Sequence, residues 1–270
     1  MTRARVRVRN RVDRGWWWRL PLLAILWLAI AAPIVVAGAA AATLRAWARE
    51  LPEPPDLAAW RAEVPRSSIV VAADGSRLAE LPFRDGDVIG HRALTELADV
   101  PPALIRAVLA AEDVRFFAHR GVDYPAIARA ALINYQAGRV VEGASTITQQ
   151  LARNLLPREL GTARNLRRKV REALVARALE RRFAKATILS AYLDFVFLGE
   201  GAHGVAAAAR AYFDRELAAI DLPQAALLAG HGSAHGDGGA GAPSRRQEGA
   251  GERAAHAERG RREHGHDEAG

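Results

Sequence analysis

Two acidic motifs and the polar segment between them hold the side chains best suited to chemistry in this sequence. The motifs read EDVRFFAHRGVD (Glu112 to Asp123) and RRKVRE (Arg167 to Glu172), and the segment reads EGASTITQQLARN (Glu142 to Asn154). Two carboxylates far apart in the sequence, each beside cations, are what acid–base catalysis or charge-stabilised group transfer requires. The sequence therefore predicts a site for a reaction of this kind.

Glu112 is the first candidate for a catalytic group. With Asp113 it follows an apolar helical stripe between Leu104 and Leu109. A carboxylate at the end of such a helix can lose part of its solvent and be tuned as a general base. A Glu-Asp pair in this position is more often a solvated helix end, so these two residues alone do not decide the function.

Hydrogen-bonding side chains are dense in the polar segment. Five of six successive positions carry one: Ser145, Thr146, Thr148, Gln149 and Gln150. A helix N-cap at Ser145 accounts for one of the five and leaves the others unexplained. Donors at this density suit a cleft that binds a sugar diphosphate.

Cations surround the glutamate of the third motif. Arg168 lies four residues and Lys169 three residues before Glu172, so all three share one helix face. Such pairs are common on surfaces, where each contributes about 0.3–0.5 kcal/mol. Further basic residues nearby favour an anionic ligand: Arg158, Arg164, Arg167 and Arg171. Nucleic acid is not favoured as this ligand, because no aromatic side chains are interleaved with the cations.

The N-terminal region indicates a membrane protein. The first 19 residues carry seven arginines and one aspartate, and the next 25, from Leu20 to Leu44, carry no charge. About 20 apolar residues span a bilayer, and arginines before such a span predict a cytoplasmic N-terminus. We therefore expect a basic cytoplasmic arm over 1–19 and a single-pass anchor in the inner (plasma) membrane over 20–44. A signal peptide cleaved near Ala37-Gly38-Ala39 is the alternative, and in either case the remainder is exported.

The chain after the anchor is expected to be mainly α. Residues 45–66 are Pro-rich and polar, as is typical of a linker, and 67–100 form a lead-in that begins with a hairpin around Asp74-Gly75. Helical periodicity begins at Pro101 and delivers Glu112 near the end of the first helix. Further helices are predicted over 124–136, 145–156, 162–183, 186–198, 205–213 and 222–229.

The composition changes at residue 231. Residues 231–270 contain no Val, Ile, Leu, Met, Phe, Trp or Tyr, so they cannot bury a core and are predicted to be disordered. A reading-frame shift or truncation in the gene would explain the change, and a natural tail is the alternative. Five of the eight histidines lie here, but without a fixed spacing they do not predict a metal site. The chain has no cysteine, which excludes disulfides and cysteine-ligated metals.

Five motifs in order, over about residues 67–230, resemble those of the peptidoglycan glycosyltransferases (family 51). This family comprises the polymerase domain of class A penicillin-binding proteins and the monofunctional transglycosylases. The first motif matches at Glu112, Phe116, His119, Gly121 and Asp123, and the second and third are the segments described above. The fifth matches at Gly199, Gly204, Ala207, Ala208, Tyr212 and Phe213.

The fourth motif departs from the family pattern at two positions. It keeps Lys185, Ile188, Leu189, Tyr192 and Leu193. Ser190 replaces a glutamate, and Asp194 replaces an asparagine. Because these positions are generally structural in the family, we expect altered packing or lower stability before lost chemistry.

The resemblance implies a lysozyme-like helical glycosyltransferase domain over 67–230, behind the single transmembrane helix and ahead of the disordered tail. It implies Glu112 as general base and Glu172 as a second essential carboxylate. The substrate-binding residues that it implies are Asp113, Phe116, His119, Ser145, Thr146, Gln149, Gln150, Arg153, Asn154, Arg168 and Lys169. Arg153 stands where the family usually has lysine, which keeps the positive charge and should preserve activity. No residue is implied as a metal ligand, although the resemblance allows a divalent cation, Mg²⁺ or Mn²⁺, at the diphosphate.

The implied reaction is the polymerisation of lipid II, the undecaprenyl-diphosphate disaccharide-pentapeptide. Glu112 would deprotonate the acceptor 4-hydroxyl, which attacks C1 of the donor N-acetylmuramic acid with inversion to a β-1,4 linkage and release of undecaprenyl diphosphate. The implied partners are lipid II, the growing glycan strand, the inner membrane and the cell-wall synthesis machinery. Apolar residues between Tyr124 and Val141 are expected to rest on the membrane.

Two other functions stay open at the level of the sequence. One is a truncated or degenerate protein that binds lipid II or partner proteins without turnover, as the tail, Ser190 and Asp194 would suggest. The other is a lysozyme-like enzyme that cleaves glycan, which would not need the cationic diphosphate clamp. No transpeptidase activity is expected, because the chain lacks the Ser-x-x-Lys, Ser-x-Asn and Lys-Thr-Gly set of β-lactam-binding domains.

Overall fold

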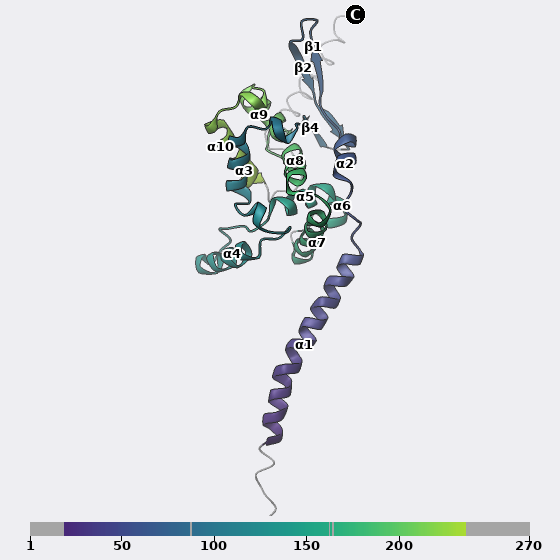
Figure 1. Ribbon diagram of the computed structural model, residues 1–270, viewed down its shortest axis with the longest axis vertical. Coiled ribbons are helices and arrows are strands. Elements are labelled where there is room, and N and C mark those ends of the chain that lie inside the picture. Colours follow the sequence, from purple (N-terminus) through teal and green to yellow (C-terminus); the bar gives the residue numbers. More distant parts are fainter. Residues whose placement is uncertain (1–18, 87, 162, 164, 236–270) are drawn as a thin grey trace, which may run out of the picture. The chain divides into compact units, whose positions relative to one another are not determined.

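The computed structural model describes residues 19–86, 88–161, 163 and 165–235. The chain divides into two units at Glu50, and each is described by itself. Helices dominate both units, so the predicted mainly α fold is confirmed (Figure 1). Residues 1–18 of the predicted basic arm (1–19) and residues 236–270 of the predicted tail lie outside the described residues.

The first unit is helix α1, Arg19–Arg49. Its 31 residues include the predicted anchor, and they make it long and apolar enough to cross a membrane. Pro33 lies inside the helix, as transmembrane helices tolerate. A signal sequence would pass the same test of length and composition, so both sequence interpretations remain compatible with α1.

The second unit begins with a helix where a linker was predicted. Helix α2, Leu57–Glu63, starts at the N-cap Asp56, whose carboxylate accepts hydrogen bonds from the amides of Ala58 and Ala59. Leu57 is buried, and the Trp60 ring stacks on Phe195 with 3.6 Å between the ring centroids. Part of the predicted linker 45–66 is therefore packed onto the domain, because an apolar pair three residues apart gives this short helix a buried face.

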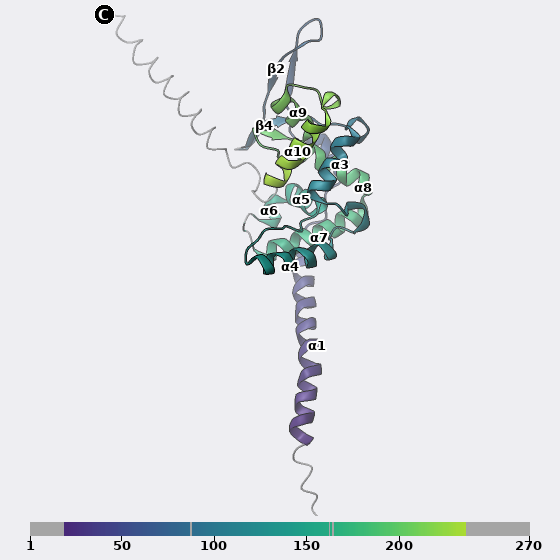
Figure 2. The same ribbon diagram turned by 90° about the vertical axis from the view of Figure 1, so that its left-hand side faces the viewer.

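Two small sheets follow α2. The predicted hairpin is confirmed: β1 (Ser68–Val71) pairs antiparallel with β2 (Arg77–Leu81) around a turn in which Gly75 has φ +83°. The hairpin projects from the domain, at the end opposite to α4 (Figures 1 and 2). The second sheet was not predicted, and its order is β3 (Phe83–Asp85), β4 (Val88–Arg92) and β5 (Ala202–His203). Since β5 lies more than 100 residues after β4, no local pattern could indicate this pairing.

Helices make up the rest of the second unit. They are α3 (Pro102–Glu112), α4 (Tyr124–Ala137), α5 (Ile147–Leu155), α6 (Pro157–Leu160), α7 (Leu166–Arg182), α8 (Lys185–Phe195), α9 (Val205–Phe213) and α10 (Leu222–His235). Single turns of 3₁₀ helix lie at η1 (Leu97–Asp99), η2 (Phe116–Ala118) and η3 (Leu217–Ala219). Helix α10 continues to His235, so the boundary predicted at residue 230 lies inside a helix.

Helix α5 is the centre of the domain. It packs against α7 and α8, and seven of its nine residues are buried. Ile147 and Leu151 join the core with Leu104 of α3, Leu179 of α7 and Ile188 of α8. The buried residues of α5 also include polar ones, which need hydrogen-bond partners in the interior. These partners define the candidate site.

Candidate active site

Helix α3 brings Glu112 to the site and ends there. Pro102 opens the helix in its first turn, and Leu104 and Val108 hold its inner face in the core. Asp113 caps the end with an extended backbone, and its amide donates to the Leu109 carbonyl. Glu112 is thus the last helical residue, partly exposed, as the sequence predicts.

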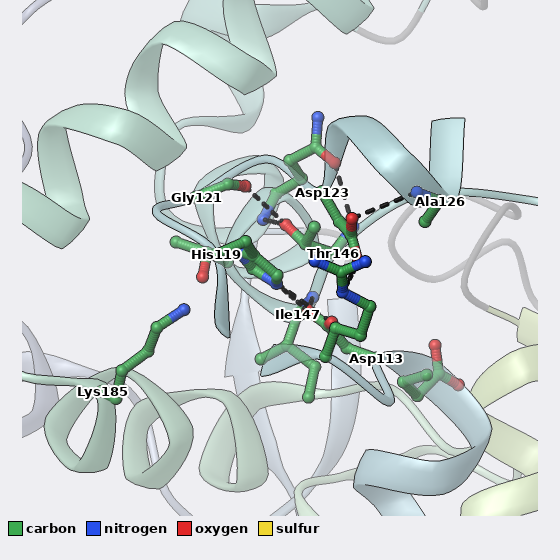
Figure 3. Close-up of polar contacts among 12 residues, drawn as sticks. Asp113, His119, Gly121, Asp123, Ala126, Thr146, Ile147 and Lys185 are labelled. Atoms are coloured by element: carbon green, nitrogen blue, oxygen red, sulfur yellow. Dashed lines mark hydrogen bonds and ion pairs between the residues drawn. The ribbon is translucent and has the colours of Figure 1, made fainter. Parts of the chain in front are cut away.

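Asp113 joins the first motif to the start of α5. Its buried carboxylate accepts a hydrogen bond from the Ile147 amide at 3.0 Å. His119 Nε2 lies 3.0 Å from both carboxylate oxygens, and because a carboxylate only accepts, this nitrogen carries the proton (Figure 3). Asp113 and His119 were predicted to bind substrate; their burial and mutual contact support a positioning role.

The N-terminus of α5 is fixed by a capping box. Thr146 Oγ1 accepts from the Gln149 amide at 3.2 Å, and Gln149 Oε1 accepts from the Thr146 amide at 2.9 Å. Thr146 Oγ1 also donates to the Gly121 carbonyl at 2.7 Å. The cap is therefore Thr146, not Ser145 as the sequence suggested, and Ser145 is left to serve another partner.

Gly121 lets the loop of the first motif reach α7. Its φ of +87° lies in the left-handed region, and a Cβ there would come within 2.8 Å of the Ala176 backbone. Only glycine fits this close approach. Asp123, two residues after Gly121, caps α4 by accepting a hydrogen bond from the Ala126 amide at 3.1 Å.

Glu112 is connected to the interior through Gln150. The amide nitrogen of Gln150 donates to Glu112 Oε2 at 2.6 Å, and Gln150 Oε1 accepts from the Tyr192 hydroxyl at 3.4 Å. Burial, and then the charge of Glu112, raise the pKa of Tyr192 well above its ordinary value. The hydroxyl therefore stays protonated and acts as a donor.

The third motif forms a cationic cluster around a buried carboxylate. Glu172 is only 1% exposed, and its carboxylate lies 3.0 Å from Arg168 Nη1 and 3.2 Å from Lys169 Nζ. Lys169 Nζ also donates to Ser145 Oγ at 2.8 Å. A buried carboxylate is tolerated because the two cations compensate its lost solvation. The predicted pairs are thus present within α7, and the hydrogen bond from Lys169 to Ser145 links them to the segment before α5.

A further carboxylate with a buried side chain, Glu180, contacts α5 and was not predicted. Glu180 Oε1 accepts from Thr148 Oγ1 at 2.6 Å and from Lys185 Nζ at 2.7 Å, and His119 Nδ1 lies 3.9 Å away. The Lys185 ammonium also lies 4.2 Å from the centroid of the buried Phe116 ring. A threonine inside the predicted helix was the one available signal, since a buried hydroxyl needs a partner.

The remaining predicted residues lie at the far end of α5. Arg153 and Asn154 occupy its last turn and are partly exposed. The charge of Arg153 lowers the pKa of Tyr192, whereas the charge of Glu112 raises it. A cation and a carboxylate therefore both lie near this hydroxyl. Helix α5 is therefore bonded at one end to Lys169, through Ser145, and along its length to Glu112, through Gln150.

This arrangement separates the two carboxylates by environment. Glu112 is partly exposed and held by a neutral amide, which suits a group that accepts a proton from a bound hydroxyl. Glu172 is buried and compensated by cations, which suits the orientation of Lys169 and Arg168 toward an anion. Within the described residues, no group of three or more His, Cys, Asp or Glu side chains could hold a metal ion.

Comparison with known proteins identifies relatives of this chain. A family model described as transglycosylase matches residues 83–254, a span that runs past the domain boundary predicted at 230. Penicillin-binding protein 1A of Aquifex aeolicus is 43% identical over 181 residues, which are 67% of this chain and 23% of that protein. Penicillin-binding protein 2D of Bacillus subtilis is 40% identical over 168 residues, 62% of this chain and 23% of that protein.

A third relative gives the same result. Penicillin-binding protein 1A of Neisseria gonorrhoeae is 43% identical over 151 residues, which are 54% of this chain and 18% of that protein. The chain thus spans about a quarter or less of the length of the curated relatives it matches.

Proposed function

The chain belongs to the transglycosylase family, and from this premise we propose that it polymerises lipid II into β-1,4-linked glycan strands. Growth would release undecaprenyl diphosphate and invert the anomeric centre. The observation that carries the proposal is the pairing of a partly exposed Glu112, held by Gln150, with the cluster of Arg168 and Lys169 around the buried Glu172. A base and an anion-binding group in one site are what this transfer requires.

Glu112 is the general base in this proposal. It would remove the proton from the acceptor 4-hydroxyl as that oxygen attacks C1 of the donor sugar. The 2.6 Å hydrogen bond from Gln150 to Oε2 fixes the orientation of the carboxylate. A fixed base needs little reorganisation at the moment of proton transfer, which lowers the barrier.

Lys169 stabilises the negative charge of the departing diphosphate. Its ammonium is held between Ser145 and Glu172, and its side chain is still 39% exposed, so a bound anion can reach it. Arg153 at the end of α5 is a second cation for this anion. A divalent cation at the diphosphate stays a prediction, and no step is assigned to it.

The substrate and product are lipids, so the enzyme should work at a membrane surface. Helix α1 would anchor the chain in the plasma membrane with its N-terminus in the cytoplasm, and the second unit would lie outside. The apolar side chains predicted to rest on the membrane are exposed on and after α4: Tyr124, Ile127, Leu132, Tyr135, Val140 and Val141. An exposed apolar patch of this kind is typical of a membrane contact. Association with the cell-wall synthesis machinery is part of the same proposal.

The non-catalytic alternative loses part of its support at Asp194. In the sequence Asp194 favours this alternative, but its carboxylate accepts hydrogen bonds from Arg61 at 2.7 Å and from the Thr95 amide at 2.9 Å. The substitution is therefore accommodated by local partners. Glycan cleavage is also less favoured, because hydrolysis gives no role to the cations around Glu172.

Polymerisation of fluorescent lipid II, in detergent with a divalent cation, tests the proposal. We expect polymer from the full chain, none from Glu112→Gln, and an unchanged yield from Glu159→Gln, an exposed carboxylate on α6. Lipid II binding without polymer would support the non-catalytic alternative. Release of fragments from preformed glycan would support a cleaving enzyme.

A further inference from the structure

Helix α10 runs alongside α3, the helix that ends at Glu112 (Figures 1 and 2). Ala225, Leu228 and Ala229 are buried and lie on one face at the spacing of a helix. Gly232 continues this stripe one turn later and is also buried. The buried face of α10 therefore extends past the residue at which the composition of the sequence changes.

The buried stripe of α10 has no side chain at Gly232, the position at which it reaches the Glu112 carboxylate. A Cβ at Gly232 would lie 3.1 Å from Glu112 Oε1 and 3.6 Å from Leu198 Cδ2. A Cβ at Gly230, two residues earlier on the same helix, would meet nothing within 4 Å. The close approach is thus specific to position 232 and to the end of the Glu112 side chain.

We propose that Gly232 is a positioning residue for Glu112: the missing side chain allows α10 to pass the carboxylate without displacing it. This inference rests on the proposed role of Glu112 as general base. If it is correct, the first residues after position 230 line the site.

A methyl group at position 232 would act on Glu112 in two ways. At 3.1 Å the carboxylate must move by a few tenths of an ångström, whereas the 3.6 Å approach to Leu198 is an ordinary contact. This movement would disturb the 2.6 Å hydrogen bond between Gln150 and Oε2. The methyl would also bring apolar surface against Oε1, and loss of solvation raises the pKa of a carboxyl group.

The charged and titratable groups around Glu112 are the same in both glycine variants. Asp113 follows it in the chain, Arg153 lies on α5 and Tyr192 on α8, while the His231 ring on α10 packs beside Tyr212. His231 Nδ1 is engaged with the Leu227 carbonyl at 2.9 Å. Since both substitutions add one methyl group, any difference between them must come from the position of that methyl relative to Glu112.

The test compares Gly232→Ala with Gly230→Ala in the full chain. Both changes raise helix propensity by the same amount, so both should fold and neither should lower the melting temperature through the backbone. For Gly232→Ala we expect a lower kcat and an acid limb of the pH–rate profile shifted upward by about half to one pH unit. For Gly230→Ala we expect the profile of the parent chain.

A second measurement does not depend on activity. The Glu112 carboxyl carbon can be titrated by NMR in ¹³C-glutamate-labelled chain, with its signal assigned from the spectrum of Glu112→Gln. An upward shift in Gly232→Ala, absent in Gly230→Ala, supports the inference even if lipid II is not the substrate. Identical titrations and identical pH–rate profiles in the two variants would overturn it, whereas a parent chain without polymerase activity would overturn the proposed function alone.

Discussion

The side-chain amide of Gln150 has two different ends, and the site uses both. Its nitrogen donates to Glu112 at 2.6 Å and its oxygen accepts from the Tyr192 hydroxyl at 3.4 Å. If the amide turned over, its oxygen would face the carboxylate and two acceptors would repel each other. Because the Glu112 carboxylate can only accept, it selects this orientation of Gln150, and the buried Tyr192 hydroxyl stabilises the orientation by donating to the amide oxygen.

Replacing Tyr192 with phenylalanine should therefore lower kcat more than it changes KM. The lost orientation corresponds to one hydrogen bond of about 1 kcal/mol, or roughly a fivefold lower kcat. Tyr212→Phe is the matched control, because the Tyr212 hydroxyl donates to the Leu198 carbonyl at 2.8 Å and makes no contact with Gln150. Equal losses of kcat in the two variants, measured by lipid II polymerisation, would show that the effect is one of general stability.

At the scale of elements, α2 and α8 are joined by a buried ion pair. Arg61 of α2 reaches Asp194 of α8, which is fully buried. Burial raises the pKa of Asp194 to about 6 from an ordinary 3.8, against the opposing effects of the Thr95 amide and Arg61. A raised carboxyl pKa gives stability that is complete below pH 4 and is lost as the pH rises through about 6.

The sheet that joins the lead-in to the segment between α8 and α9 behaves in the opposite way. Burial, and then the charge of Arg92, lower the pKa of His203 on β5 to about 4 from an ordinary 6.5. A lowered histidine pKa gives stability that is complete above pH 6.5 and is lost as the pH falls through about 4. Between pH 4 and 6 the contributions of Asp194 and His203 therefore have opposite slopes.

Single substitutions should separate the two slopes. In Asp194→Asn, stability should rise with pH between 4 and 6, because only the histidine contribution remains. In His203→Gln it should fall over the same interval, and each change should be at most about 3 kcal/mol. The free energy of unfolding of the full chain, measured by denaturant at several pH values, gives the comparison. Parallel curves for the two variants would contradict the assignment.

The sequence predicted those elements whose stability is local. Helix α9 has the predicted bounds, and α3 begins one residue after the position at which the helical period starts. Helix α2 was missed because its seven residues are flanked by prolines and depend on the distant Phe195 for their buried face. The pairing of β4 with β5 was missed for the same reason, since the two strands meet only after the chain has folded.

The candidate site likewise has residues that the sequence predicted and residues that it could not predict. The motifs identified Glu112, Glu172 and Lys169, because residue type and spacing are visible in the sequence. Which polar side chain caps α5 was predicted one residue too early, since Thr146 has both the Gln149 partner and the Gly121 carbonyl. The contacts of Glu180 with Thr148, Lys185 and His119 could not be predicted, because these four residues come from four different segments.

At the scale of the whole molecule, the exposed apolar surface on and after α4 has no partner among the described residues. Tyr135 is 86% exposed, Val140 is 84% exposed and Leu132 is 57% exposed. Such exposure is unfavourable in water, at roughly 25 cal/mol for each Å² of apolar surface. A bilayer that also holds the lipid substrate would cover this surface and present the substrate to the same domain.

Replacing Leu132 and Tyr135 together with serine should therefore affect activity only where a membrane is present. Each apolar side chain that enters the bilayer contributes roughly 1–2 kcal/mol, so the double variant should lose at least about tenfold of its polymerisation rate in vesicles containing lipid II. In detergent, where substrate reaches the site from a micelle, the loss should be smaller. Leu78→Ser on the β1–β2 hairpin, 67% exposed in the parent chain, is the control for removing an exposed apolar residue elsewhere. An equal loss in vesicles and in detergent would mean that the two residues act on folding or chemistry, and no loss in either would mean that this surface does not meet the membrane.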